Sequence, residues 1–170
     1  QSVQIEVERQ GTMEALEIPV QDLHAISPAA YLQAGGAVFN TLSYQQARNY
    51  GVPARGVYVA GQGYMLRRAG VPRGAILTEL DSQPIDDLES FEKILAAIPE
   101  GQKTTLRYFN LSNPRSARVA TIEPSRSLFS MELCSRDDAT GRWPCRSSAS
   151  ALPASPRVPA TTTMLSTKRG

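Results

Sequence analysis

The sequence is poor in the residues that carry most enzymatic chemistry. Only one histidine, His24, occurs among its 170 residues. A Ser-His-Asp triad would have to use it, and Asp22 is poorly placed to orient it, because residues two apart on a strand point the same way. No serine lies in a G-x-S-x-G turn. We therefore predict that this chain is not itself an enzyme, and that His24 is a solvated or structural residue.

Cysteine is equally scarce. Cys134 and Cys145 are separated by ten residues, which is neither a disulfide framework nor a zinc spacing. A bridge across a local hairpin is one interpretation, and two unrelated free thiols are the one that we favour. The acids Asp81, Asp86 and Asp87 are explained by a turn and a helix N-terminus rather than by a cation. We expect no metal site and no cofactor.

Long apolar runs and strong net charge are also missing. The absence of 18 consecutive apolar residues predicts no membrane span, and the N-terminus has no signal-peptide core. Residues 1–123 hold 11 Lys/Arg and 13 Asp/Glu (net −2), and residues 124–170 hold 7 and 3 (net +4). This positive charge is too dilute for a nucleic-acid surface. Because the chain begins with Gln1, we expect a piece of a longer or processed protein.

Alternating apolar residues predict two similar β-hairpins. The first covers residues 1–20, with its turn at Gln10-Gly11, and the second is "TTLRYFNLSNPRSARVATIEP", with its turn at Ser112-Asn113-Pro114. Two hairpins of one style about 100 residues apart favour tandem domains. We expect residues 1–20 to close a preceding repeat, and residues 21–124 to form the next domain.

Two helices are predicted between the hairpins. Ser43 and Gln46 form a capping box for a helix over 44–50, which Gly51 and Pro53 end. Asp86 and Glu89 form a second box for a helix over 87–98, whose apolar residues share one face.

Short strands are predicted at 36–42, 56–61 and 75–80, and "GQGYMLRRAG" is interpreted as a turn in which Arg67 and Arg68 are solvated or bind an anion. The connections are too short for parallel βαβ units. The predicted fold class is therefore α+β, a small, partly closed antiparallel sheet or barrel with two helices.

The pattern thins after Pro124. We expect residues 125–146 to form an extension with a small hairpin around Thr140-Gly141. From Ser147 to Thr163, 14 of 17 residues are Ser, Thr, Ala or Pro, which cannot bury enough apolar area to offset their ordering entropy. Residues 147–170 are therefore predicted to be disordered.

With catalysis, metal binding and nucleic-acid binding disfavoured, the remaining candidate function is the binding of a peptide through backbone hydrogen bonds. An open strand at 36–42 beside the helix over 87–98 would suit β-augmentation, in which an extended peptide adds a strand to a sheet. Gly35 and Gly36 precede that strand, and successive N–H groups in such a turn can hold a carboxylate.

Residues 25–123 resemble the permuted PDZ domain of the Deg/HtrA family of serine proteases. The stretch "IPVQDLHAISPAAYLQAGGAVFNTLSYQQARNYGVPARGVYV" is similar to the PDZ-like modules of long fungal and plant members, and "VQDLHAI" and "LSYQQAR" are its most specific motifs. In these proteins several PDZ-type repeats follow a trypsin-like domain, so the resemblance implies that the protease domain lies outside this chain. It also implies a nuclear or cytoplasmic location, with an organelle as the alternative.

The resemblance gives a candidate site and candidate partners. The candidate peptide-binding residues are Gly35, Gly36, Ala37, Val38, Phe39, Leu88, Phe91 and Leu95. The implied partners are extended or C-terminal peptide segments of substrate proteins, the neighbouring PDZ and protease domains, and further copies of the parent in a homo-oligomer; nucleic acid and membranes are not expected.

The sequence also departs from the family pattern at this site. Gly36 takes the place of the family's loop glycine, while Gly35 and Ala37 stand where bulky apolar residues normally flank it, so the pocket should be shallow. In "RGAIL" the family's aspartate is absent. Two hypotheses follow: a peptide-binding module that regulates a serine protease, or a structural packing or oligomerisation module with a degenerate carboxylate loop.

Overall fold

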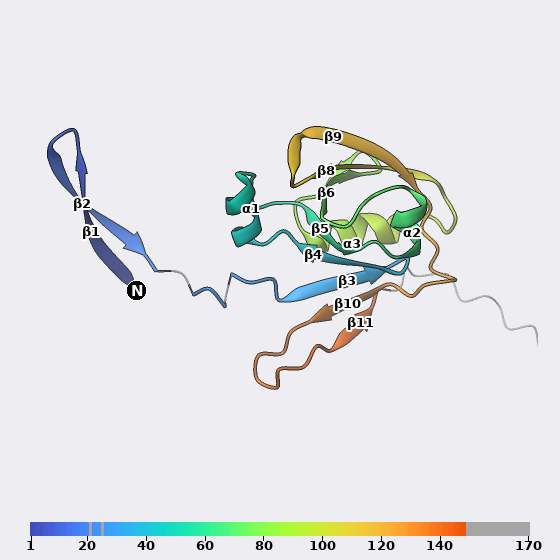
Figure 1. Cartoon of the computed structure of the whole chain (residues 1–170). Helices are drawn as coiled ribbons and strands as arrows, with labels where there is room; N and C mark the ends of the chain where they lie inside the picture. The colour runs from blue at the N-terminus through green and yellow to red at the C-terminus, as the bar shows by residue number, and fades with distance from the viewer. Residues whose placement is uncertain (21, 25, 149–170) are drawn as a thin grey trace, which may run out of the picture.

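The computed structural model describes residues 1–20, 22–24 and 26–148. The predicted N-terminal hairpin is present as β1 (Ser2–Arg9) and β2 (Thr12–Pro19), with Gln10 and Gly11 in the turn. It forms a separate two-stranded sheet, and Figure 1 shows it standing apart from the rest of the molecule. Val3 lies opposite Ile18 and Ile5 opposite Leu16, so one face of the hairpin is apolar and exposed.

The body is built on a nine-stranded antiparallel sheet. The strands, listed in chain order, are β3 (Ala30–Ala34), β4 (Ala37–Thr41), β5 (Val57–Gly61), β6 (Ala75–Leu80), β7 (Gln83–Pro84), β8 (Thr104–Asn110), β9 (Asn113–Ile122), β10 (Glu132–Ser135) and β11 (Cys145–Ser147). Their order across the sheet is β11-β10-β3-β4-β5-β6-β8-β9, with β7 paired to β6. The sheet curls but is not closed, since β11 and β9 are its two edges (Figure 1).

Three short helices accompany this sheet, where the sequence predicted two. They are α1 (Tyr44–Tyr50), α2 (Gly63–Arg68) and α3 (Leu88–Ala97). The helix α2 replaces the turn predicted at "GQGYMLRRAG". Its glycine Gly63 has a positive φ of 56° at the helix start, so one turn of helix follows a glycine that sequence analysis assigned to a loop. None of the helices in the described part of the chain is long and apolar enough to cross a membrane.

The helix caps follow the predicted chemistry, with one shift. The side chain of Ser43 accepts the N–H of Gln46, and Gly51 ends α1 in the left-handed conformation. For α3 the cap is Asp87 with Ser90, one residue beyond the predicted pair Asp86 and Glu89. The Asp87 carboxylate accepts the Ser90 N–H at 2.8 Å, and this bond to the backbone lowers the pKa of Asp87.

The two hairpins predicted within residues 104–148 are both present. β8 and β9 pair around Leu111 and Ser112, so Asn113 and Pro114, expected in the turn, begin β9 instead. β10 and β11 form the predicted small hairpin. Cys134 and Cys145 are disulfide-bonded across it, so the interpretation as two free thiols is wrong. The predicted disordered segment 147–170 lies almost wholly outside the described residues.

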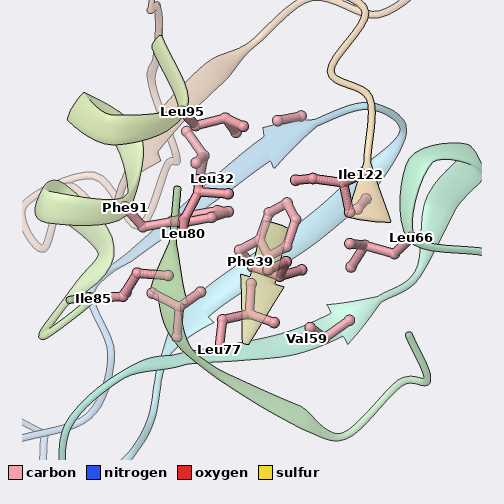
Figure 2. Close-up of a cluster of buried hydrophobic side chains, with 14 of the residues drawn as sticks. Leu32, Phe39, Val59, Leu66, Leu77, Leu80, Ile85, Phe91, Leu95 and Ile122 are labelled. Carbon is pink, nitrogen blue, oxygen red and sulfur yellow. The ribbon is translucent and has the colours of Figure 1, made fainter. Parts of the chain in front are cut away.

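The main hydrophobic core lies between α3 and the curled sheet. The side chains of Leu32, Phe39, Leu80 and Phe91 are almost completely buried in it (Figure 2). Leu106 on β8 belongs to the same core. A smaller cluster, built from Leu42, Ala47, Ile76 and Leu111, packs α1 against the other face. The core thus places α3 directly over β3, β4 and β6, where the candidate site was expected.

Because β1 and β2 pair with no other strand among the described residues, we expect deletion of residues 1–20 to leave the body intact. Its free energy of unfolding in urea, followed by Trp143 fluorescence and circular dichroism, should change by less than about 0.5 kcal/mol. Deletion of residues 131–148 is the positive control: it removes Met131 from the core and should destabilise the body, and it is followed by circular dichroism alone because it also removes Trp143. A loss of more than about 1 kcal/mol on removing the hairpin would contradict the prediction.

Candidate peptide groove

Strand β4 was expected to be an open edge, and it is not. β3 pairs with it along one side, from Tyr31 opposite Asn40 to Ala34 opposite Ala37, and β5 pairs along the other. Gly35 and Gly36 form the two-residue turn between β3 and β4, with φ of 58° and 73°. Positive φ at both central residues is the mark of a type I′ hairpin turn, which Gly-Gly favours. The glycines expected to grip a carboxylate therefore make a tight turn.

β3 lies where an added peptide strand was expected. It pairs with β4 and packs its inward side chains, Leu32 and Ala34, into the core beneath α3. Figure 2 shows Leu32 between Leu95 and Phe91. The rings of Phe39 on β4 and Phe91 on α3 are 4.9 Å apart between centroids, so no open trough separates strand from helix. The groove is filled by the chain itself.

The structure brings most of the predicted site residues together, in the core rather than at a surface. Ala37, Phe39, Leu88, Phe91 and Leu95 belong to one buried cluster, each with at most 4% of its surface exposed. Val38 is half-buried and lies opposite Gly61 on β5. Peptide binding by these residues stays a prediction, because it would require β3 to leave.

Helix α2 holds the Gly35-Gly36 turn in place. The N–H groups of Tyr64 and Met65 both donate to the carbonyl oxygen of Gly35, at 3.1 and 3.0 Å. A Cβ on Gly63 would lie 2.0 Å from the backbone of Gly36, so only glycine allows this approach. The N–H groups of Tyr64 and Met65 beside the turn thus already have the carbonyl oxygen of Gly35 as their acceptor.

The outer edge of β3 is covered in turn by β10. Glu132 to Ser135 pair with Gln33 to Ala30, and β11 continues the sheet beyond them. Glu92 on α3 is 5% exposed, and it accepts hydrogen bonds from Arg146, at 2.8 Å, and from Ser148. In the same hairpin, the ring of Trp143 lies against that of Tyr31 on β3, with centroids 5.5 Å apart and the ring planes tilted by 45°. These contacts hold β3 from its outer side.

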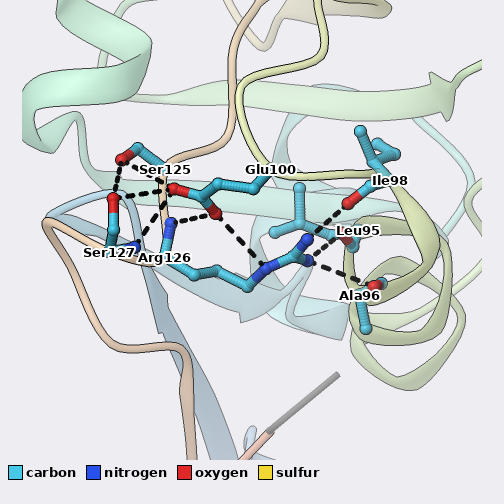
Figure 3. A network of polar contacts seen from close by, with 7 residues as sticks. All are labelled: Leu95, Ala96, Ile98, Glu100, Ser125, Arg126 and Ser127. Carbon is cyan, nitrogen blue, oxygen red and sulfur yellow. Dashed lines mark hydrogen bonds and ion pairs between the residues drawn. The ribbon is translucent and has the colours of Figure 1, made fainter. Parts of the chain in front are cut away.

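A polar network ties the segment before β10 to the end of α3 (Figure 3). The guanidinium of Arg126 donates to the carbonyl oxygens of Leu95, Ala96 and Ile98, which a helix end leaves without intrahelical partners. The carboxylate of Glu100 accepts the backbone N–H groups of Arg126, at 2.8 Å, and of Ser127, at 3.1 Å. These bonds lower the pKa of Glu100 from its ordinary value of 4.5 to about 2.

The few residues with catalytic chemistry are dispersed. The exposed His24 ring lies 3.2 Å from Asp138, while its backbone N–H donates to Asp22. The hydrogen bonds from Arg136 and then His24 lower the pKa of Asp138. Residues 1–148, where described, hold no group of three His, Cys, Asp or Glu side chains placed to bind a metal ion.

The comparisons with known proteins agree with this architecture. Residues 25–101 match the family described as "PDZ-like domain". The chain carries a PDZ-like domain. It is 34% identical over 160 residues to "Protease Do-like 7" of Arabidopsis thaliana. The aligned residues make up 93% of this chain and 15% of that protein.

Fungal relatives match the domain equally well. The "Pro-apoptotic serine protease NMA111" of Yarrowia lipolytica is 38% identical over 145 residues, and that of Saccharomyces cerevisiae is 34% identical over 154 residues. These matches cover 83% and 89% of this chain and 15% of each relative. The chain thus spans about 15% of the curated relatives that it matches, and it corresponds to their PDZ region rather than to the protease domain.

Sequence analysis missed two parts of this PDZ-like domain that decide its geometry, β3 and Arg126. β3 is short and carries only Leu32 as a large buried residue, so its alternation is weak. The signal that could have found it is the Gly-Gly pair before an apolar strand, since such a pair favours a hairpin. Arg126 has no local signature, because its partners lie 26 to 31 residues away.

The turn gives a matched pair of variants. Gly35→Ala places a Cβ 2.6 Å from Cβ of Met65 at a positive φ, and should lower the free energy of unfolding by about 2–4 kcal/mol. Gly11→Ala has the same kind of φ, with nothing within 4 Å of the added Cβ, and lies on the separate hairpin. It should leave unfolding of the body unchanged in urea titrations; equal effects of the two variants would contradict this account.

The pKa of Glu100 predicts a pH dependence. Because the folded-state pKa is lowered, Glu100 stabilises the fold fully above about pH 4.5, its value when unfolded, and loses this contribution as pH falls toward 2. Urea unfolding of Glu100→Gln should be easier than that of the wild type at pH 7, and the difference should shrink between pH 4.5 and 2. Glu8→Gln, on the exposed hairpin, should show no such change; a constant difference for Glu100→Gln would overturn the assignment.

Proposed function

We propose that this chain is a non-catalytic PDZ-like module of a Deg/HtrA-type serine protease, and that it acts chiefly as a structural packing module. The observation that supports the proposal is that β3 occupies the strip between β4 and α3, where a peptide would add. A strand from outside would have to break this pairing and expose Leu32, whose side chain is fully buried.

The contacts around β3 support a permanent rather than a passing arrangement. The turn is fixed by α2, the outer edge is paired with β10, and the disulfide joins β10 to β11. The hydrogen bonds to Glu92 connect β11 to the middle of α3, and those to Glu100 connect the segment before β10 to the residues that follow α3. A module built in this way presents fixed surfaces to neighbouring domains instead of an adjustable groove.

The N-terminal hairpin is the surface that most needs a neighbour. An isolated two-stranded hairpin is marginally stable in water, and this one exposes Val3, Ile5, Leu16 and Ile18. β8 and β9 form a hairpin of the same style at one edge of the sheet of the present domain. We propose that residues 1–20 close a preceding PDZ-type repeat, whose core would cover this apolar face.

The packing proposal is tested by nuclear magnetic resonance (NMR) titration with C-terminal and extended peptides. At millimolar peptide, the amides of residues 39–41 on β4 and 91–95 on α3 should keep their chemical shifts, because β3 holds the position. Leu32→Ala should lower the free energy of unfolding by about 3 kcal/mol, as expected for a buried leucine.

The matched control is Gln33→Ala, on the exposed side of β3, which should cost less than about 0.5 kcal/mol. Peptide-induced shifts along β4 and α3, together with loss of hydrogen-exchange protection in β3, would overturn the proposal and favour peptide capture in the groove.

A further inference from the structure

Charge is distributed unevenly between the N-terminal hairpin and the first half of the body. Residues 1–20 hold four glutamates and one arginine. Residues 25–78, which include β3, β4, α1, β5 and α2, hold five arginines and no Lys, Asp or Glu. Opposite net charges on two neighbouring parts of one chain favour contact between them and oppose other partners of the same sign.

Three of the glutamates share one face of the hairpin. Paired residues of an antiparallel hairpin point to the same side and successive residues alternate, so Glu6, Glu8 and Glu17 lie on the face opposite the apolar one. The register places Glu17, Glu6 and Glu8 in that order, two residues or about 7 Å apart along the hairpin. None of them forms an ion pair among the described residues; the pair of Arg9 with Glu14 is on the apolar face.

Two of the five arginines lie at the end of the body where the hairpin is attached. Tyr31, at the start of β3, pairs with Asn40 near the end of β4, and α1 begins a few residues later, so α1 lies close to the point where the chain enters the sheet (Figure 1). Arg48 is in the last turn of α1 and Arg55 precedes β5. Both are exposed, and within the part of the chain that the structure describes neither pairs with a carboxylate.

The two surfaces also match in their apolar side chains. α1 exposes Tyr44 and Tyr50, with 49% and 51% of their surfaces accessible. On the acidic face of the hairpin, Met13 lies opposite Glu8 and is 60% exposed. A methionine sulfur makes a favourable contact with an aromatic ring, and a tyrosine can cover apolar surface while its hydroxyl stays in water. Contact would therefore bury apolar area as well as pair charges.

The other surface near the attachment point is less suited to an acidic partner. The turn between β10 and β11 carries Asp137 and Asp138, and His24 of the segment after the hairpin lies 3.2 Å from Asp138. A face with three carboxylates would be repelled by these two acids. Nothing of that sign lies on α1 or between α1 and β5.

We propose that the acidic face of the N-terminal hairpin docks on α1 of the same chain, with Glu6, Glu8 and Glu17 facing Arg48 and Arg55. Residues 20–29 join the two parts, and ten residues span at most about 35 Å, which is enough for this contact. The inference deepens the proposed packing function and rests on it in one respect, since the preceding repeat covers the apolar face and leaves the acidic one. Ion pairs across the contact would fix the orientation of two successive repeats more than their affinity.

Docking through exposed ion pairs is weak in this chain by itself. Each such pair contributes little to a folded structure, and Figure 1 shows the hairpin apart from the body. A docked fraction of about one half adds RT ln 2 to the free energy of unfolding, which is within the limit given above for deletion of residues 1–20. The experiment must therefore detect a contact that is only partly populated.

The test uses the whole chain with a nitroxide label on Gln10→Cys, in the hairpin turn, and with the native disulfide left oxidised. Paramagnetic broadening in NMR should reach the amides of residues 44–50 on α1 and not those of residues 63–68 on α2. Arg48→Glu with Arg55→Glu should reduce the broadening at least about fivefold, because attraction becomes repulsion. Adding Glu6→Arg and Glu8→Arg to that variant should restore it.

The matched control is Arg67→Glu with Arg73→Glu. Like the α1 pair, these are two exposed arginines, one in the last turn of a helix and one in the loop that follows it. They should change the broadening of α1 less than twofold. Because Arg48 also favours the C-terminal end of its helix, Arg55→Glu alone, outside the helix, should reduce the broadening about twofold.

Three results would overturn the proposal. The first is an equal effect of the two double variants. The second is broadening of α1 that persists in about 1 M sodium chloride, where the Debye length is only about 3 Å. The third is broadening between separate spin-labelled and isotope-labelled chains, which would make a second copy the source of the hairpin.

This experiment and the peptide titration can fail separately. The titration reads residues 39–41 and 91–95, which report on β3 and not on α1. No broadening at α1, with those amides unmoved by peptide, would overturn the docking of the hairpin and leave the packing proposal intact. Peptide-induced shifts along β4 and α3 would overturn the packing proposal, while broadening of α1 that charge reversal removes would still support docking.

Discussion

The pairing of β3 with β4 beneath α3 is the constraint on which the rest of the domain depends. β3 contributes Leu32 and Ala34 to the core. At the same time it pairs with the backbone N–H and C=O groups along one side of β4. An unpaired edge would expose a row of N–H and C=O groups, and an unfilled groove would expose Phe39, Phe91 and Leu95. β3 removes both problems at once.

The surrounding elements are arranged so that β3 keeps this position. A two-residue turn joins the C-terminal end of β3 directly to β4. Two N–H groups of α2 donate to the carbonyl oxygen of Gly35 and fix that turn. β10 pairs along the outer side of β3, and its own placement depends on the segment that Arg126 and Glu100 attach to the end of α3. The helix and the strand beneath it are thus connected through a third element, which makes their separation a concerted event.

Local chemistry made much of the fold predictable. Alternation gave both long hairpins, the Ser43 cap and Gly51 gave α1, and the apolar face gave α3, because in each case the signal lies within about ten neighbouring residues. The disulfide, the pairing of β10 with β3 and the Arg126 network depend on contacts between distant segments. Of the candidate site, the sequence correctly brought Phe39, Phe91 and Leu95 together; it could not show that β3 would cover them, since core and groove demand the same apolar residues.

The energetics of an internal strand explain why apolar residues at this position need not mean peptide capture. If β3 is held by at least the roughly 3 kcal/mol typical of one buried leucine, the groove is open in less than about 1% of molecules. Any intrinsic affinity for a peptide is then reduced by the same fraction, on the order of 100-fold. A peptide that binds an open groove at micromolar concentration would need roughly 100 times more to compete with β3. Recognition by this domain is therefore better served by surfaces that the chain leaves free, where binding has no internal strand to displace.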